Sequence, residues 1–404
     1  MPIAKKQYDP TRLGPLQGIR VLDFSRLVAG NMLSLQLADF GAEVVKVEQP
    51  GRGDTLRDWK ENGHSIYWKV YGRNKKSISL NLKSPGATEI VKELARGFDV
   101  VIESFRYRYM EELGLGPEDL RTINSKLVYV RVSGFGQTGP YASRPGFGTL
   151  IEAMSTFADR NGFPDREPVL PPLALADMVA GLYGAMATMI AIREVELKRG
   201  EGQVIDLSLM EPLFTVLGPE AAIFRATGKK HTRVGSASEI SAPRNVYATK
   251  DGGWVAISAS TQRMTERLFS AIGRGDLNEN PDYKTAPARV KRRSEVDAIV
   301  GGWIKQYTLT ENLVFFEKNG ITAAPVYNIA QLIEDPHIQH REVVYEVPDE
   351  DLGSLMMNCA APALMNTPAT LRSPAPSIGQ HNREVYSRFY SDTEIAEFEA
   401  RKII

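Results

Sequence analysis

The chain has 404 residues, 43% hydrophobic and 24% charged, and its 49 basic side chains balance its 49 acidic ones. A neutral chain has no overall field that would gather nucleic acid or an anionic membrane, so any anion it binds must be held by local clusters. The single cysteine, Cys359, excludes an intramolecular disulfide and a cysteine-rich metal site, and it is typical of a reducing compartment.

The first half of the chain alternates β-branched runs with helical ones. Residues 18–24 and 41–48 are the first two such runs, and they flank an amphipathic helix expected over 29–40. Further strands are expected over 76–82, 99–103, 127–133 and 203–208, with helices over 85–96, 117–123 and 177–198. This alternation predicts an α/β fold, a Rossmann-like parallel sheet with helices on both faces.

A chain of this length favours a large domain together with a smaller one. Residues 1–225 are expected to form the amino-terminal part of the large domain, and 226–328 a linker and a small α+β domain. The small domain should contain a hairpin over 246–259 and helices near 265–272, 290–304 and 310–319. From 329 to 404 the sequence predicts an irregular, proline-rich tail with a helix near 392–401.

No segment has the length of a membrane span, since the longest apolar stretch, 178–192, falls short of the ~20 residues required. Residues 1–16 contain no apolar run, so no secretory signal is expected. The sequence therefore predicts a cytoplasmic protein with no membrane or nucleic-acid partner.

The loops that follow the strands are the expected ligand site, because parallel sheets bind ligands beyond the carboxyl ends of their strands. The chain has no dinucleotide fingerprint, no phosphate loop and no zinc helix, so neither a dinucleotide cofactor nor a metal is expected. Cations do gather there, at Arg52, Arg57, Arg106 and Arg108 and in the run Arg73-Asn74-Lys75-Lys76. They favour an anion with several phosphates, although a charged run before a strand is also typical of a solvated turn.

Asp177 stands at the front of the longest expected helix. One interpretation is a helix cap that satisfies free amides of the first turn. The other is a nucleophile: the helix dipole would lower its pKa and keep it ionised, and a carboxylate can attack a thioester without a general base.

The segment Ser133-Gly-Phe-Gly-Gln-Thr-Gly-Pro-Tyr141 follows a strand. Its glycines allow the backbone to approach a ligand closely, and they would equally suit a bare tight turn.

Nine segments in order resemble one family. They are Gly18–Ser25, Asp39–Glu48, Gly51–Asp54, Arg73–Ser77, Asp99–Phe105, Gly134–Pro140, Leu175–Gly181, Gly200–Ser208 and Gly379–His381. Together they resemble the class III CoA-transferase family, which includes formyl-CoA transferase and, as a side branch, α-methylacyl-CoA racemase.

The resemblance implies an intertwined homodimer in which residues 329–404 return to the large domain. It places the catalytic aspartate at Asp177, and it implies no permanently bound cofactor, coenzyme A thioester being a substrate. The CoA contacts it implies, together with the glycine loop, are Arg26, Val28, Ala29, Arg73, Asn74, Lys75, Lys76, Ser104, Arg106, Gly134, Gly136 and Gln137.

The resemblance also implies a reaction, transfer of CoA from an acyl-CoA to a carboxylic acid through aspartyl anhydride and aspartyl-CoA thioester intermediates. A dicarboxylic acyl group such as succinyl is expected, and Arg144, Arg166, Arg225 and Arg244 are candidates to hold its distal carboxylate. The alternatives are a racemase and a CoA-binding protein without catalysis. The racemase branch uses a histidine where this chain has Phe147, which cannot take a proton.

Overall fold

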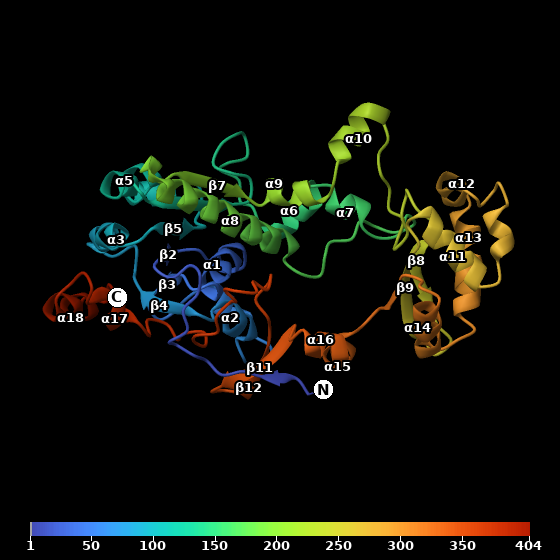
Figure 1. Cartoon of the computed structure of the whole chain (residues 1–404). Helices are drawn as coiled ribbons and strands as arrows, with labels where there is room; N and C mark the ends of the chain where they lie inside the picture. Colours follow the sequence, from blue (N-terminus) through green and yellow to red (C-terminus); the bar gives the residue numbers. More distant parts are fainter. Residues whose placement is uncertain (1) are drawn as a thin grey trace. The chain divides into compact units, whose positions relative to one another are not determined.

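The computed structural model describes residues 2–404, the side chains of Lys198 and Arg199 excepted, and the chain forms two compact units (Figure 1). The first unit runs to Ser155 and also takes in Pro171–Gly218 and Pro336–Ile404. The second unit takes in Thr156–Leu170 and Pro219–Asp335. From the sequence, the linker and small domain are expected over 226–328. The second unit extends beyond this range at both ends and also includes the earlier segment Thr156–Leu170.

A six-stranded parallel sheet forms the centre of the first unit. Its order is β4-β3-β2-β5-β6-β7. The strands are β2 (Arg20–Asp23), β3 (Glu43–Glu48), β4 (Lys75–Ser79), β5 (Val100–Glu103), β6 (Val128–Ser133) and β7 (Val204–Ser208). Most of their residues are buried, as expected of strands covered on both faces. The predicted α/β class and parallel sheet are confirmed.

Helices cover both faces of this sheet, and each layer has its own apolar core. One layer contains α3 (Ala87–Arg96), α5 (Pro117–Ile123), α17 (Asn382–Tyr386) and α18 (Asp392–Ala400). The other contains α1 (Ala29–Asp39), α6 (Gly148–Met154), α8 (Leu175–Glu194) and α9 (Met210–Val216). The short elements η1 (Thr55–Asp58), α2 (Ile66–Tyr71), α4 (Tyr109–Glu112) and η2 (Val195–Arg199) complete the unit up to its last segment.

Helix α8 packs very closely against α1. A Cβ on Gly181 would lie 2.8 Å from the carbonyl oxygen of Ala29, and one on Gly184 would lie 2.6 Å from Leu33. By length and composition alone, the stretch Leu175–Leu197 could cross a membrane, with a mean hydropathy of 1.6. It is therefore longer than the apolar stretch identified from the sequence. One side of the helix packs on α1, β6 and β7, and 44% of its most apolar window is buried.

The carboxyl-terminal segment is more regular than the sequence predicted. After α16 (Pro336–His340), β11 (Val344–Asp349) and β12 (Gly353–Asn358) form an antiparallel hairpin, and β1 (Ala4–Lys5) pairs in parallel with β11. The expectation of an irregular tail was wrong here. Pro348 lies within β11, and a proline in a sequence argues against a strand. The strand pattern is nevertheless present, because the alternate residues Tyr345 and Val347 are buried.

The second unit is an α+β body with a three-stranded antiparallel sheet of order β10-β9-β8. The strands are β8 (Arg244–Ala248), β9 (Trp254–Ser258) and β10 (Ala323–Pro325), and the first two form the expected hairpin. Its helical elements are α7 (Phe157–Arg160), α10 (Glu220–Thr227), α11 (Gln262–Ala271), η3 (Gly275–Asn278), α12 (Ala286–Lys291), α13 (Arg293–Ile304), α14 (Leu309–Lys318) and α15 (Ile329–Glu334).

Candidate active site

Asp177 lies in the first turn of α8 but does not cap it. The helix begins at Leu175, so Asp177 is its third residue, and the side chain of the N-cap residue, Ala174, makes no hydrogen bond. The amide of Ala176 is instead satisfied from another helix, because it donates to Glu152 Oε1 of α6 at 3.0 Å. Asp177 is therefore not the N-cap residue: its carboxylate accepts from its own amide, and Glu152 satisfies that of Ala176.

The electrostatic expectation for Asp177 is also corrected. The helix position of Asp177 predicts a lowered pKa. Instead, burial first and the nearby Glu152 carboxylate second raise the pKa of Asp177 to about 6. Desolvation of the half-buried carboxyl group outweighs the hydrogen bond from its own backbone amide, which lowers the pKa. A carboxyl group with a pKa of about 6 is still about nine-tenths ionised at pH 7, so it remains available as a nucleophile.

Gly148, the first residue of α6, lies against the Asp177 carboxylate. A Cβ built on Gly148 would lie only 2.1 Å from Asp177 Oδ2. Any side chain at this position would therefore displace the carboxylate, so the absence of one is what gives Asp177 its place. Phe147, immediately before it, is exposed and offers no group that accepts a proton.

The glycine loop leads from β6 to α6 and so helps to place Gly148. Gly134 and Gly146 meet backbone to backbone, since a Cβ on Gly134 would lie 2.6 Å from the Gly146 Cα. Gly136 has a φ of +85°. The backbone N–H of Gln137 donates to both carboxylate oxygens of Asp206, at 3.0 and 2.9 Å. Close backbone packing and one carboxylate thus hold the loop.

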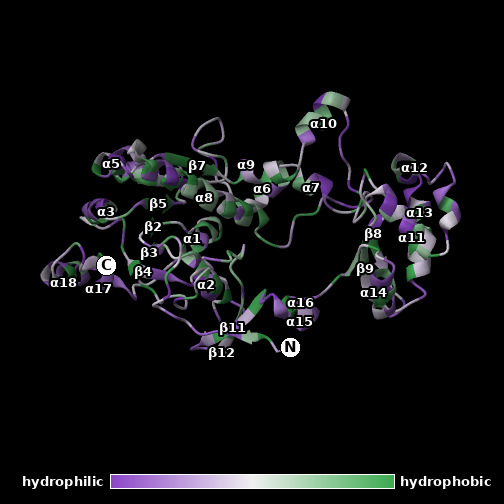
Figure 2. Cartoon of the chain, viewed as in Figure 1, coloured by the Kyte–Doolittle hydropathy of each residue, from purple (hydrophilic) through white to green (hydrophobic). Residues whose placement is uncertain are grey.

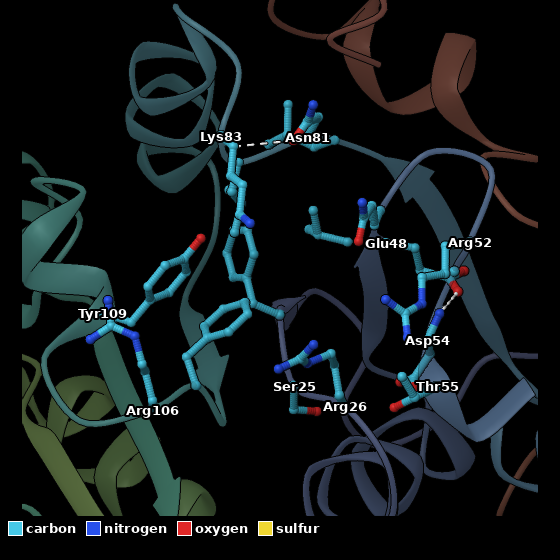
Figure 3. A pocket seen from close by; sticks show the side chains of 17 residues that line it. Ser25, Arg26, Glu48, Arg52, Asp54, Thr55, Asn81, Lys83, Arg106 and Tyr109 are labelled. Carbon is cyan, nitrogen blue, oxygen red and sulfur yellow. Dashed lines mark hydrogen bonds between the residues drawn. The ribbon is translucent and has the colours of Figure 1, made fainter. Parts of the chain in front are cut away.

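A cavity of about 400 Å³ opens where β2, β3, β4 and β5 end (Figure 3). Its cations come from separate loops: Arg26 follows β2, Arg52 follows β3, Lys83 follows β4 and Arg106 follows β5. Arg106 is paired with Glu112, whereas Arg26, Arg52 and Lys83 have no carboxylate within ion-pair distance in residues 2–404. Three exposed, unpaired cations around one cavity can receive phosphate groups.

The loop after β2 connects this cavity with Asp177. Arg26 lines the cavity, and its backbone N–H donates to Ser104 Oγ at 3.0 Å. Two residues later, Val28 belongs to an apolar cluster that also includes Ala174 and Met178, the residues that flank the start of α8. Ala29 is buried at the start of α1. A ligand seated in the cavity along this loop would therefore be directed toward the first turn of α8.

The basic run Arg73–Lys76, expected from the sequence to contact CoA, is not among the residues that line this cavity. Arg73 is buried in an ion pair with Asp39, at 2.6 Å, and the Asn74 amide donates to the same carboxylate at 2.8 Å. Buried Lys75 donates to Asn31 at 3.0 Å, and Lys76 pairs with Glu43 and Glu384. These residues are occupied in joining β4 to α1 and to the carboxyl-terminal segment.

Several residues of the site were not identified from the sequence. Asn81 and Lys83 follow β4, a strand end that the predicted topology already marked as a ligand loop, so the topology could have found them. Gly148 and Glu152 gave no such signal, because their roles depend on how α6 packs against α8. Within residues 2–404 no group of histidine, cysteine and acidic side chains could hold a metal ion.

The four arginines proposed for a distal carboxylate do not belong to one unit. Arg144 lies in the first unit, 3.8 Å over the ring of Tyr141, and the other three lie in the second. Arg244 donates to the carbonyl oxygens of Ser236 and Ala237.

Known proteins resemble this chain over nearly its whole length. The family model for CoA-transferase family III matches residues 16–382. Succinyl-CoA–D-citramalate CoA-transferase of Chloroflexus aurantiacus is 36% identical over 96% of this chain and 98% of its own. Succinate–glutarate CoA-transferase of Agrobacterium fabrum is 33% identical over 93% and 96%. The crystal structure of a CaiB/BaiF family protein from Brucella suis covers 94% of this chain and 100% of its own, with 30% identity and a TM-score of 0.82.

Proposed function

We propose that Asp177 is the nucleophile through which this chain, which belongs to CoA-transferase family III, passes CoA from a dicarboxylic acyl-CoA to a second carboxylic acid. The chain is a CoA-transferase. The observation that carries the assignment of the nucleophile is the position of Asp177. Its carboxylate is half-buried in the first turn of α8, beside Gly148, and the loop Arg26–Ala29 leads to it from the cavity of unpaired cations.

The proposed chemistry moves no proton. The Asp177 carboxylate attacks the thioester carbonyl and the C–S bond breaks, so that CoA leaves as thiolate and the acyl group remains on Asp177 as a mixed anhydride. The thiolate then attacks the Asp177 carbonyl carbon, releasing the donor acid and leaving an aspartyl-CoA thioester. The acceptor carboxylate attacks this thioester, and the returning thiolate takes the acceptor acyl group from the second anhydride, which regenerates Asp177.

The nucleotide end of CoA is proposed to occupy the cavity at the strand ends. Arg26, Arg52 and Lys83 would meet its phosphates, and Ser104 would hold the loop that carries Arg26. Arg106, already paired with Glu112, would stack its guanidinium at the rim near Tyr109, 5.2 Å from the ring centre. The glycine loop Gly134–Gln137 is proposed to border the thioester, where its backbone amides could meet developing oxyanion charge.

We propose succinyl-CoA as the donor and a small dicarboxylic or hydroxy-dicarboxylic acid as the acceptor. The relatives at 33–36% identity carry names that pair succinate with citramalate or glutarate. A panel of such acids, each incubated with succinyl-CoA and followed by the appearance of a new CoA thioester, would identify the acceptor.

One experiment tests the nucleophile. Incubated with succinyl-CoA alone, the wild-type chain should gain the mass of CoA at Asp177, and borohydride or hydroxylamine should trap the adduct. Asp177→Asn should bind CoA and gain nothing. An adduct in Asp177→Asn would contradict the assignment. Exchange of the α-proton into heavy water without an adduct would instead identify a racemase, and neither reaction would identify a binding protein.

We also propose that the enzyme works as an intertwined homodimer. Leu182, Met186 and Ile190 recur every four residues along α8 and are exposed, so they form one apolar stripe. Much of the α8 ribbon is green in Figure 2, the colour of hydrophobic residues. A second copy of the chain would cover this stripe. Met186→Asp should convert a dimer to a monomer in sedimentation, and a wild-type monomer would contradict the proposal.

A cytoplasmic location is proposed on the half-buried, unpaired Cys359, the one cysteine of the sequence, which suits a reducing compartment. Cell fractionation would test it.

A further inference from the structure

We propose that Glu152 is the positioning residue for Asp177: from α6 it holds the first turn of α8 in place and, through its charge, sets the reactivity of the Asp177 carboxylate. This inference rests on the proposed function of Asp177. It concerns a residue four positions after Gly148, so both lie on the same side of α6 and both meet the start of α8.

The first part of the proposal follows from the hydrogen bond between the two helices. Ala176 is fully buried, and the N-cap residue before it, Ala174, has no side chain that could satisfy its amide. Glu152 Oε1 accepts from this amide at 3.0 Å. Because Asp177 is the next residue, the bond fixes the backbone from which the nucleophile projects.

The second part follows from the burial of the Glu152 charge. Glu152 is 2% exposed, and none of the basic side chains that the structure describes forms an ion pair with its carboxylate. Burial strengthens the charge interaction of Glu152 with its neighbours, because little solvent screens it. Its effect reaches Asp177, whose pKa is raised to about 6 by burial first and by Glu152 second. A more basic carboxylate is also a better nucleophile.

No other titratable group replaces Glu152 in this role. The elements packed against α8 are α1, α6, α9, β6 and β7, together with η2, which continues α8 at its far end. Glu196 of η2 pairs with Arg193 there. The remaining titratable groups on these elements have other partners or are exposed. Asp39 pairs with Arg73, and Arg131 pairs with Glu103 and Glu111. Asp206 accepts from the Gln137 amide, the Tyr129 hydroxyl donates to the Leu115 carbonyl, and Glu211 is exposed. Burial and the Glu152 charge are accordingly what raise the pKa of Asp177.

The test is the pH dependence of kcat/KM for succinyl-CoA in wild type and Glu152→Gln. Glutamine keeps an oxygen for the Ala176 amide and removes the charge. The acidic limb of the profile, where kcat/KM falls as Asp177 is protonated, should therefore move to lower pH by about half to one unit. The constant value of kcat/KM reached by pH 8 should fall about two- to threefold, because the Asp177 carboxylate becomes less basic. Glu118→Gln, at an exposed glutamate of α5, is the matched control and should overlay the wild type.

Glu152→Met removes both the charge and the hydrogen bond at similar volume. It should shift the limb like Glu152→Gln and lower kcat by a further tenfold or so, because Asp177 loses its fixed backbone. CoA affinity and circular dichroism, unchanged in both variants, would show that the fold is intact. A limb that stays within about 0.2 units of wild type in Glu152→Gln and Glu152→Met would overturn the inference.

The same measurements separate the two proposals. Transfer activity in Asp177→Asn would overturn the proposed nucleophile and this inference with it. An inactive Asp177→Asn together with an unmoved limb in Glu152→Gln would overturn the inference alone.

Discussion

Lys46 of β3 and Lys75 of β4 are both buried, Lys46 against Ser25 of the loop that precedes α1 and Lys75 against Asn31 of α1, yet their pKa values move in opposite directions. Burial lowers the pKa of both, but Lys46 pairs with Asp54 at 3.0 Å and Asp23 at 3.3 Å, and these carboxylates raise it above its usual value. Lys75 has only the neutral oxygens of Asn31, at 3.0 Å, so burial lowers its pKa to about 7 and the nearby Lys46 adds to the lowering.

This difference predicts unequal costs of replacement. Lys46→Met should lower the free energy of unfolding by about 3–5 kcal/mol, because it leaves Asp23 and Asp54 buried without their cation. Lys75→Met should change it by less than about 1.5 kcal/mol, since no charged partner is stranded. Urea unfolding at pH 7.5 measures both, and equal losses would contradict the electrostatic account.

The pH profile of the wild-type enzyme should show an acidic limb with a midpoint near the Asp177 pKa of about 6. The reactive form is the carboxylate, so activity is full above this pH and falls about tenfold per unit below it. The measurement is kcat/KM for succinyl-CoA between pH 4.5 and 8. A limb centred near 4, where an exposed aspartate titrates, would show that burial does not tune Asp177.

Asp177 should cost the protein stability. Its pKa is higher in the folded chain, about 6, than the ordinary value of 3.8, so the cost appears as pH rises from about 4 to 6 and is complete above pH 6. At pH 7.5 the free energy of unfolding of Asp177→Asn should therefore exceed that of wild type by about 2 kcal/mol after solvent screening, and the variant should unfold at a higher temperature. At pH 4 the two proteins should be equally stable. Calorimetry at the two pH values checks the sign.

Gly148→Ala should impair transfer and leave CoA binding intact. The new methyl group would lie 2.1 Å from Asp177 Oδ2, so the carboxylate must move, and a misplacement of about 1 Å can cost about a hundredfold in rate. Gly302→Ala, in α13 of the second unit, is the matched control, because a Cβ there meets nothing within 4 Å. Steady-state kinetics on both variants would distinguish a local clash from a general effect of alanine.

The unpaired cations of the cavity should control affinity for CoA. Arg52→Ala and Lys83→Ala should each raise KM for succinyl-CoA about tenfold with kcat nearly unchanged, since a phosphate contact is made equally in ground and transition states. Lys126→Ala, an exposed lysine away from the cavity lining, should change neither constant. If Lys75→Met raised KM for succinyl-CoA as much as Lys83→Ala, the buried run Arg73–Lys76 would have to take part in CoA binding after all.

The sequence was most informative where structure is local. Helix α5 matches its predicted range, 117–123, and β5 and β6 begin within one residue of theirs, because β-branched runs and a proline start carry their own signals. The site required tertiary information. In the sequence, the run Arg73–Lys76 looks like a surface cluster. In the structure most of it is buried, because Arg73 forms an ion pair with Asp39, which lies 34 residues earlier. Likewise the environment of Asp177 depends on Glu152, on a helix that the sequence did not predict.

The interrupted layout of the first unit also has a consequence during synthesis on the ribosome. The second unit is mostly one continuous stretch, Pro219–Asp335, and can close as it emerges, whereas β1 must wait for β11, about 340 residues later. β4 waits longer still for its carboxyl-terminal partners His381 and Asn382, which bond to Ser77 and Ser79. The nascent sheet thus spends most of translation with an open edge, and chaperone contact is expected to concentrate there.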